Sequence, residues 1–285
     1  MTNETFADGY SIRKVRYEQV HHVGPQDFSA LLDVLQLHNG DIVGDICAGY
    51  GAVAREVLAR ADQTGIVVRP VLVDRSPDQL DRSYEELPNK PVSRVISDVR
   101  SLPFKNCYFD KAAIKMGLHE MPLLEQQTAV NEVYRTLKPE GVFAVWSTLA
   151  LDEIEQAMFQ AIVREKDRLA GFDSLARDRY LQREGQVCSL LRNAGFTNIQ
   201  KVWGITYCLS TAGRLHAEFG GDTAKLQTWN DFIRSHVPEH LRGRFDYRDT
   251  ETDITMKFNQ GIIRCTKPLV DFNNQPNSQN ERGNS

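Results

Sequence analysis

Residues 45–54 read DICAGYGAVA, and this stretch decides the fold class. An apolar run ends in Asp45, a loop of small residues follows, and a helical pattern then begins. Glycine accepts positive φ angles and lets a ligand approach the main chain, and Gly49 and Gly51 supply both properties. A strand, a tight glycine loop and a helix in this order are typical of nucleotide-binding turns. Cys47 is the unusual residue, because it stands where such loops have their first glycine.

Strand-like and helix-like segments alternate on both sides of this loop. Apolar residues recur at helical spacing in some segments, and β-branched residues concentrate in others. The expected helices are 28–37, 52–61, 76–87 and 123–137, and the expected strands are 41–48, 65–74, 91–98, 109–117 and 142–149. Such an alternation with short connections predicts a parallel sheet with helices on both faces, an α/β fold of the Rossmann-like, doubly wound kind.

Chemically suggestive residues stand at the ends of four of these strands. They are 45–51, Asp74, Asp98 and 117–121. Open α/β sheets bind ligands outside the carboxyl ends of their strands, at the switch in strand order. Four strands therefore bring their loops to one rim, which is a stronger indication of a binding site than any single motif.

Two nucleotide cofactors fit the spacing of the loop. Asp74 follows the loop by about twenty residues, where an acid can hold both hydroxyls of a ribose, as in NAD-binding proteins. However, Cys47 breaks the first glycine of the NAD pattern, and an acid before the loop does not favour a pyrophosphate. Asp45 favours a cofactor that carries a positive ammonium or sulfonium group.

The ordered motifs resemble those of class I S-adenosylmethionine-dependent methyltransferases, of the ubiquinone/menaquinone-biosynthesis type. The similar segments are DICAGYG (45–51), VLVDRSPDQL (71–80), SDVRSLPFKNCYFDKA (97–112) and RTLKPEGVFAV (135–145). The resemblance runs from about residue 28 to 150, with a weaker part at 195–267. It implies a seven-stranded sheet whose last strand is antiparallel, and S-adenosylmethionine as the cofactor.

The resemblance also implies roles for residues on the rim. Asp74 would hold the ribose, Asp98 would bind the adenine amino group, and Val99 would flank the ring. The whole cofactor-binding set that we expect is Asp45, Cys47, Gly49, Tyr50, Gly51, Asp74, Arg75, Asp98, Val99 and Lys115. Tyr50 fits packing against the next helix equally well.

Residues for the methyl acceptor are harder to find in the sequence. His119 follows the fourth strand and is a candidate general base, since the pKa of histidine suits neutral pH; a packing role is the competing interpretation. Tyr10 and Tyr17 are further candidates for contact with the substrate. The pair His21 and His22 has no evident third ligand, so we expect no metal site.

The chain divides into five expected parts. They are an N-terminal lid (1–27), a cofactor-binding core (28–150), a helical addition (151–194), the final strands (195–268) with a helical insertion at about 206–252, and a disordered tail (269–285). The additions are expected to cover the rim of the sheet, although helices that only pack would give the same pattern.

The composition argues against a nucleic-acid-binding protein and against a membrane-spanning one. The chain has 285 residues, 41% of them hydrophobic, and a net charge of −4, which does not favour nucleic acid as a partner. No apolar stretch reaches the roughly 20 residues of a membrane span, and the start lacks the apolar core of a signal peptide. The five cysteines form no Cys-x-x-Cys pair, so a reducing cytoplasm is expected. The partner expected is a small molecule, and the sequence does not indicate an oligomeric state.

Two alternatives to a methyltransferase stay open. One is an enzyme of the same fold that uses S-adenosylmethionine for cyclisation or another group transfer. The other is a non-catalytic, methyltransferase-like protein that has lost cofactor binding, against which the intact Asp74 and Asp98 argue.

Overall fold

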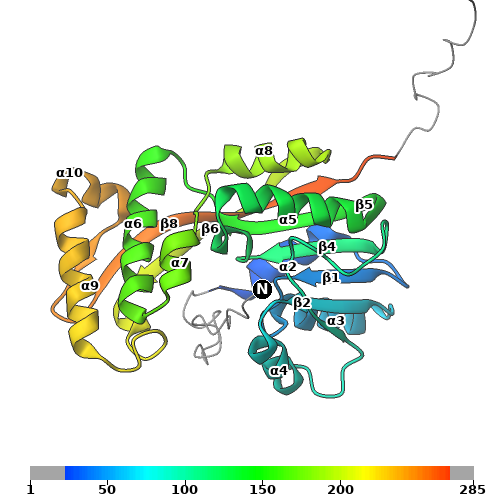
Figure 1. Cartoon of the computed structure of the whole chain (residues 1–285), viewed down its shortest axis with the longest axis horizontal. Coiled ribbons are helices and arrows are strands. Elements are labelled where there is room, and N and C mark those ends of the chain that lie inside the picture. Colours follow the sequence, from blue (N-terminus) through cyan, green and yellow to red (C-terminus); the bar gives the residue numbers. More distant parts are fainter. Residues whose placement is uncertain (1–22, 270–285) are drawn as a thin grey trace, which may run out of the picture.

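The computed structural model describes residues 23–269 and contains a core and a cap (Figure 1). The core contains α2 (Pro25–Leu35), β1 (Ile42–Ile46), α3 (Ala52–Thr64), β2 (Arg69–Asp74), α4 (Pro77–Glu86), β3 (Ser93–Ile96), β4 (Phe109–Lys115), η1 (Leu118–Glu120), α5 (Leu123–Thr136) and β5 (Leu137–Thr148). The remaining elements are α6 (Glu153–Ala170), α7 (Asp173–Asp178), α8 (Glu184–Ala194), β6 (Thr197–Ser210), η2 (Ala212–Arg214), α9 (Thr223–His236), α10 (Glu239–Arg242), η3 (Gly243–Phe245), β7 (Arg248–Asp249) and β8 (Ile254–Thr266).

The strands form one sheet in the order β3-β2-β1-β4-β5-β8-β6, and the two-residue β7 pairs with β8. Strands β1 to β5 are parallel, whereas β8 runs antiparallel to both β5 and β6. The α/β fold and the antiparallel last strand are confirmed, with β7 as a short addition to the seven expected strands. Strand order reverses between β1 and β4, which is where such sheets bind ligands.

Apolar residues cover both faces of the sheet, as a buried parallel sheet requires. On one face α2 and α3 pack on the strands, and on the other face α5 and α8 do so. Alternation along β5 shows the division, since Val142, Ala144 and Trp146 face the first layer while Phe143 and Val145 face the second.

Local sequence signals explain where helices begin and end. The side chain of Ser76 accepts a hydrogen bond from the backbone N of Gln79 (3.3 Å) and caps α4, with Pro77 in the first turn, as expected. Helix α3 begins after Gly51 (φ 86°) and ends at Gly65 (φ 69°), both in the left-handed region that glycine adopts without strain.

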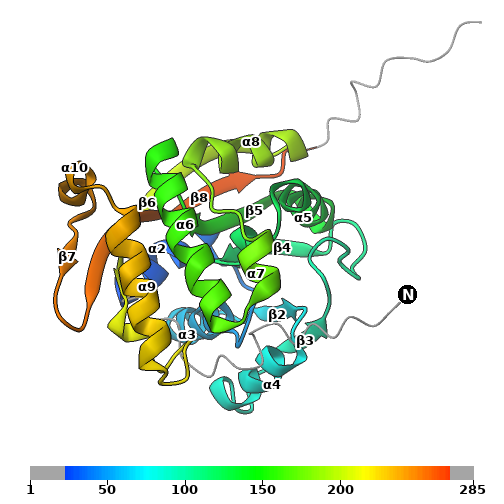
Figure 2. The ribbon, with the colours of Figure 1, turned by 60° about the vertical axis from the view of Figure 1, so that its left-hand side comes forward.

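The cap is carried by the far ends of β6 and β8. These strands stay paired from Thr197–Thr266 to Ser210–Thr255, although β5 ends at Thr148. Their extension packs on α6 and α9 around a buried cluster that includes Phe159, Trp229 and Phe258. The indole Nε1 of Trp229 donates to the carbonyl of Ile162 at 2.9 Å and joins the two helices. Figure 2 shows α6, α7 and α9 beside this end of the sheet.

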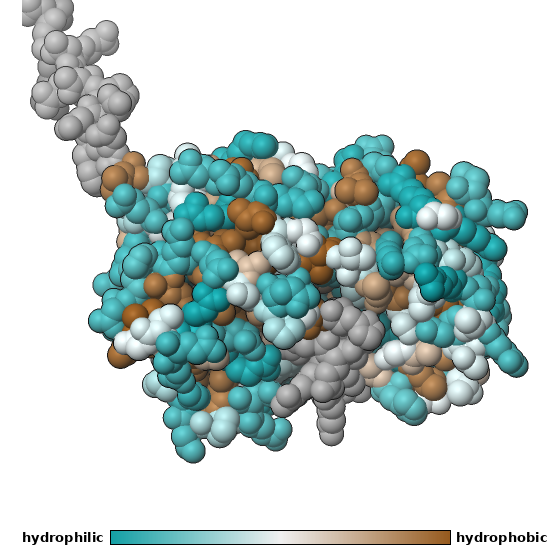
Figure 3. All heavy atoms as spheres, turned by 180° about the vertical axis from the view of Figure 1, so that it is seen from behind, coloured by the Kyte–Doolittle hydropathy of each residue, from teal (hydrophilic) through white to brown (hydrophobic). Residues whose placement is uncertain are grey.

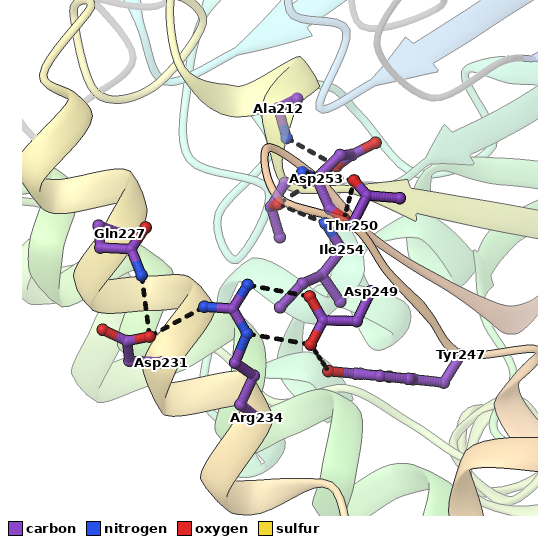
Figure 4. A network of polar contacts seen from close by, with 10 residues as sticks. Ala212, Gln227, Asp231, Arg234, Tyr247, Asp249, Thr250, Asp253 and Ile254 are labelled. Carbon is purple, nitrogen blue, oxygen red and sulfur yellow. Dashed lines mark hydrogen bonds and ion pairs between the residues drawn. The ribbon is translucent and has the colours of Figure 1, made fainter.

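Two polar networks hold the outer part of the cap (Figure 4). Arg234 of α9 bridges Asp249 of β7 with two bonds, of 2.9 and 3.0 Å, and also binds Asp231. Asp253, just before β8, accepts bonds from Ser210, Thr211 and the backbone N of Ala212, and so ties the start of η2 to β8.

Some element boundaries differ from those expected. Strand β6 runs to Ser210, beyond the start expected for the insertion at about 206, because Tyr207 and Leu209 are buried in the cap cluster. Strand β5 begins at Leu137, where it pairs with Phe109. Helix α2 begins at Pro25, within the segment assigned to the lid.

The rest of the expected lid (1–22) and all but the first residue of the expected tail (270–285) lie outside the described residues. Tyr10, Tyr17, His21 and His22 therefore have no structural description.

The surface opposite to the view of Figure 1 mixes hydrophilic areas with smaller apolar ones (Figure 3). Scattered exposed apolar residues of this kind are normal for a folded domain. Among residues 23–269, no helix has the length and apolar character needed to cross a membrane.

Candidate functional site

A cavity lies at the carboxyl ends of β1, β2 and β4 and extends to the cap. It encloses about 1580 Å³, counting the solvent at its mouth. Most of the expected rim residues line it, namely Asp45, Cys47, Gly49, Tyr50, Asp74, Arg75, Asp98, Val99, Lys115 and His119. The structure therefore brings together residues that are widely separated in the sequence.

The loop after β1 is a tight turn held to β2. Cys47 (φ 57°), Gly49 (φ 53°) and Gly51 (φ 86°) all have positive φ. The backbone N of Ala48 donates to the carbonyl of Val73 at 3.0 Å. Gly51 does not line the cavity: a Cβ there would lie 2.7 Å from Leu72, so packing and the turn require this glycine.

Asp74 is oriented by two backbone donors. Its Oδ2 accepts from the N of Gly49 (2.8 Å) and its Oδ1 accepts from the N of Ser76 (2.9 Å). Burial raises the pKa of Asp74 above its ordinary value, against the effect of these two bonds. A carboxylate oxygen has two lone pairs, so each can accept one further hydrogen bond. This geometry suits a carboxylate that receives two adjacent hydroxyl groups.

Asp45 has a structural partner as well as a place on the cavity wall. Its Oδ2 accepts from the N of Ala54 in the first turn of α3 at 3.0 Å. Burial raises the pKa of Asp45 from 3.8 to about 7, although the Ala54 bond and the charge of Lys115 lower it. The carboxyl is therefore poised between charged and neutral forms near neutral pH, and a cation bound beside it would favour the charged form.

Asp98 and Val99 form another part of the rim. Partial burial disfavours the charge on Asp98, but the guanidinium and backbone N of Arg100 outweigh it and hold the pKa of Asp98 below its ordinary value. The Arg100 N lies 2.9 Å from Asp98 Oδ1, and the guanidinium also reaches Glu125. Val99 is buried beside this pair and offers an apolar surface.

Cys47 packs against the loop after β4. A Cβ built on Gly117 would lie 2.4 Å from the Cβ of Cys47 and 2.9 Å from its Sγ. The cysteine side chain thus occupies space that a side chain at position 117 would need. Burial raises the pKa of the Cys47 thiol well above its ordinary value, which keeps it protonated and weakly nucleophilic.

The remaining expected residues surround the same space. His119 is buried in η1, and its carbonyl accepts from the N of Tyr180 at 2.9 Å, which connects η1 with the cap. The Nζ of Lys115 lies 5.2 Å from the ring centre of Trp146. Tyr50 is buried, with the guanidinium of Arg82 4.9 Å from the centre of its ring.

The sequence analysis missed the cap side of the cavity. The residues that line this wall are Thr148, Phe159, Val163, Lys166, Arg179, Leu181, Tyr207, Leu209, Arg214, Glu218 and Gln260. They come from β5, α6, the segment after α7, β6, η2 and its continuation, and β8, and no motif connects them. Four of these lining residues have buried, charged side chains, and Asp167, which does not line the cavity, is a fifth charged group in contact with them. Asp167 binds Lys166 (3.0 Å) and Arg179 (2.9 Å).

Residues 23–269 include no group of three or more His, Cys, Asp or Glu side chains that could hold a metal ion. Carboxylates and apolar side chains alternate along the cavity lining, a mixture that is common in sites for organic ligands.

Comparisons with known proteins agree with this geometry. Residues 43–141 match the family described as "Methyltransferase domain". A demethylmenaquinone methyltransferase of Chlamydia muridarum is 38% identical over 105 residues, which is 37% of this chain and 43% of that protein. A ubiquinone/menaquinone biosynthesis C-methyltransferase of a Ruegeria species is 27% identical over 180 residues, 59% of this chain and 71% of that protein.

The fold is also found among solved structures. The YcgJ protein of Bacillus subtilis superposes with a TM-score of 0.72 at 17% identity, over 86% of this chain and 100% of that one. At this identity the likeness establishes the fold alone.

Residues 43–141 are therefore similar to a methyltransferase domain, and the sheet order and the rim agree with that similarity. The matched relatives include quinone-biosynthesis methyltransferases, and the chain spans about half the length of the first of these that it matches.

Proposed function

We propose that the protein is an enzyme that transfers a methyl group from S-adenosylmethionine to a small-molecule metabolite. The observation that carries the proposal is the arrangement around Asp74 at the end of β2, whose two oxygens are fixed by Gly49 N and Ser76 N. The expected cofactor set, apart from Gly51, lines the cavity that contains it.

The residues of this chain have separable tasks in the proposed reaction. Asp74 holds the ribose, Asp98 and Val99 hold the adenine, and Asp45 faces the positive end of the cofactor. S-adenosylmethionine supplies an already activated methyl group, so the protein chiefly has to align the acceptor with it. Alignment of this kind lowers a barrier by as much as about 7–11 kcal/mol.

His119 is the proposed general base for an acceptor that must lose a proton. It lies in the same cavity, buried, on the short helix after β4. A base in this position would contribute roughly 10²–10⁴-fold to the rate, and an acidic carbon or an amine acceptor would need none.

Support for a small acceptor comes from two sources. The cap supplies one side of the cavity that would hold the acceptor, and the printed names of several relatives denote methylation of quinone precursors. The scattered cysteines support a reducing compartment such as the cytoplasm as the place of the reaction.

The cofactor is tested by titration calorimetry of the purified protein with S-adenosylhomocysteine and with NAD. We expect S-adenosylhomocysteine to bind and NAD not to bind. The reverse pattern would refute the assignment.

The reaction is tested with methyl-labelled S-adenosylmethionine and a low-molecular-mass metabolite extract, followed by mass spectrometry. A labelled product heavier than its precursor by one methyl group supports the proposal. Consumption of a substrate without transfer of the label would favour the non-methylating alternative. Failure of S-adenosylhomocysteine to bind would favour the non-catalytic one.

A further inference from the structure

Two buried polar side chains line the cavity from neighbouring strands. Thr148 is the last residue of β5 and Gln260 belongs to β8, and the two residues are 1% and 3% exposed. Among the described residues 23–269, neither Thr148 Oγ1 nor Gln260 Nε2 has a hydrogen-bond partner. Buried polar atoms usually have partners, so these two atoms indicate a ligand that supplies one.

The backbone places the two side chains next to each other. Thr148 and Gln260 are partners in the antiparallel pairing of β5 with β8. The backbone N of Leu149 donates to the carbonyl of Asn259 at 2.9 Å, which makes Thr148 and Gln260 a non-hydrogen-bonded pair of the ladder. In such a pair the Cα atoms are only about 4.5 Å apart and both side chains lie on the same face of the sheet. One small group of a ligand can therefore reach both side chains.

The orientation of the Gln260 amide determines what that group must offer. Its Oε1 accepts from the indole Nε1 of Trp146 at 3.4 Å, and an indole N–H can only donate. Nε2 is therefore left for the ligand, and it can only donate, whereas the hydroxyl of Thr148 can donate or accept. A carbonyl or hydroxyl oxygen has two lone pairs, so it can accept from Gln260 and still bind Thr148. Because neither side chain is charged, the pair itself selects for hydrogen bonding and not for charge.

The strand order puts this pair beyond the residues expected to hold the cofactor. Strands β2, β1, β4, β5 and β8 follow one another across the sheet in that order. Asp74, Asp45 and Lys115 belong to the first three of these strands, and they line the same cavity as Thr148 and Gln260. Neighbouring strands are about 4.8 Å apart, so β5 and β8 lie roughly 14 and 19 Å from β2 along the sheet. The pair is therefore placed for a second ligand that shares the cavity with the cofactor.

We propose that Thr148 Oγ1 and Gln260 Nε2 together bind one carbonyl or hydroxyl oxygen of the methyl acceptor and hold the acceptor at the β5–β8 end of the cavity. The inference rests on the proposed function, because it takes the second ligand to be the methyl acceptor. Both residues position the acceptor and select for it, and no proton or methyl group is transferred to them. An acceptor without such an oxygen would leave two buried polar atoms unpaired, at a cost in affinity.

The test uses two pairs of probes that differ by one oxygen. α-Tetralone carries a carbonyl oxygen that tetralin lacks, and α-naphthol carries a hydroxyl that naphthalene lacks. Each probe is titrated by NMR into the full-length protein, with and without saturating S-adenosylhomocysteine. The readout is the ratio of the two dissociation constants within a pair, because most of the apolar contribution to binding cancels in this ratio.

Four variants are compared with the wild-type protein. Thr148→Val replaces the hydroxyl by a methyl group, and Gln260→Met removes the amide with little change of side-chain length. Thr206→Val and Gln200→Met make the same two changes at exposed positions of β6 that do not line the cavity, and they are the matched controls.

We expect at least one oxygen-bearing probe to bind the wild-type protein about three- to tenfold more tightly than its oxygen-free match, as for hydrogen bonds between uncharged groups. Thr148→Val and Gln260→Met should each remove most of this preference, because the oxygen would then leave water without a full set of partners. Thr206→Val and Gln200→Met should retain it. A preference confined to α-tetralone would identify a carbonyl oxygen, and one confined to α-naphthol a hydroxyl.

The inference is overturned if none of the four probes binds, or if neither oxygen-bearing probe binds more tightly than its match. It is also overturned if Thr148→Val or Gln260→Met leaves the preference unchanged, or if the two control variants lower it as much as the site variants do.

The affinity for S-adenosylhomocysteine separates this inference from the proposed function. In Thr148→Val and Gln260→Met that affinity should stay at the wild-type value, which also shows that both variants fold. Its loss in these variants, or displacement of the probes by S-adenosylhomocysteine, would assign the pair to the cofactor and overturn the inference alone. Absence of S-adenosylhomocysteine binding in the wild-type protein would refute the proposed function, whatever the probes do.

Discussion

The rim and the cap meet at one cavity but are built in different ways. On the rim, backbone groups do much of the positioning, as in the bonds from Gly49 and Ser76 to Asp74, and short loops after consecutive strands supply the residues. On the cap wall, long side chains such as Lys166 and Arg214 do the positioning through buried ion pairs. The part of the cavity proposed for the cofactor therefore depends on local backbone conformation. The part proposed for the acceptor depends on side chains that come from segments far apart in the sequence.

The largest effect is expected from Trp229→Ala, which tests whether the cap is a separate folding unit. Trp229 is fully buried between α9 and α6. Its truncation should lower the free energy of unfolding by about 3–5 kcal/mol, measured by urea denaturation. Because β6 and β8 run through both parts, we expect one cooperative transition. Thr228→Ala, an exposed position on the same helix, is the control, and two separate transitions in Trp229→Ala would show that the cap unfolds alone.

The second prediction concerns pH and the buried Asp45. The pKa of Asp45 in the folded state is about 7, above the ordinary value of 3.8. As pH rises, the unfolded chain therefore loses this proton at a lower pH than the folded protein does. Stability should therefore fall as pH rises from about 4 to 7, by about 2–4 kcal/mol at most from this group. Asp45→Asn has no such proton, and the difference between the denaturation curves of wild type and variant isolates the effect. A pH-independent difference would contradict it.

The third prediction tests the close packing of the Cys47 side chain against Gly117. Gly117→Ala should cost about 1–3 kcal/mol of stability, because its new Cβ would overlap that of Cys47. Gly117 has φ −100°, which alanine adopts freely, so backbone strain is not the cause.

Cys47→Gly should be tolerated alone, since position 47 has a positive φ, and it should rescue Gly117→Ala. The double-mutant cycle measured by denaturation gives the coupling. Loss of activity in Cys47→Gly, with the cofactor still bound, would instead assign a chemical role to the thiol.

The fourth prediction concerns cofactor affinity. Asp74→Ala should weaken S-adenosylhomocysteine binding at least about tenfold, because two charge-assisted hydrogen bonds to the ribose are lost. Asp74→Asn keeps one acceptor oxygen, so its affinity for S-adenosylhomocysteine should lie between those of wild type and Asp74→Ala. Asp78→Ala, an exposed acid one turn away in α4, should bind normally in the same calorimetric titration. Equal affinities in all four proteins would place the ribose elsewhere.

The smallest effect is expected from Arg234→Gln in the outer network of Figure 4. Arg234 and Asp249 are about a third exposed, and ion pairs of this kind contribute less than about 1 kcal/mol. Thermal unfolding should therefore shift little. A loss above about 2 kcal/mol would mean that the outer network, and not only the buried cluster around Trp229, holds α9 in place.

The sequence predicted the rim better than the cap for a physical reason. Parallel strands deliver their carboxyl ends to one edge, so the positions of Asp45, Asp74 and Asp98 along the chain already imply their proximity in space. Nothing comparable relates Thr148 to Gln260, which are neighbours only through antiparallel pairing of β5 with β8. The hydrogen bonds from Arg100 to Asp98 could not be predicted from the sequence either. Two side chains that are two residues apart in a loop can point together or apart, depending on the backbone angles between them.

The uneven length of the strands has a mechanical consequence. Up to Thr148 the sheet is many strands wide, whereas beyond it only β6 and β8 continue as the main ribbon to the cap. A narrow ribbon twists and bends more readily than a wide sheet. The change from a wide sheet to a narrow ribbon falls at the Thr148–Gln260 pair. Because α6 lines the cavity, a twist of this ribbon would change the distance between α6 and the rim, and with it the size of the cavity.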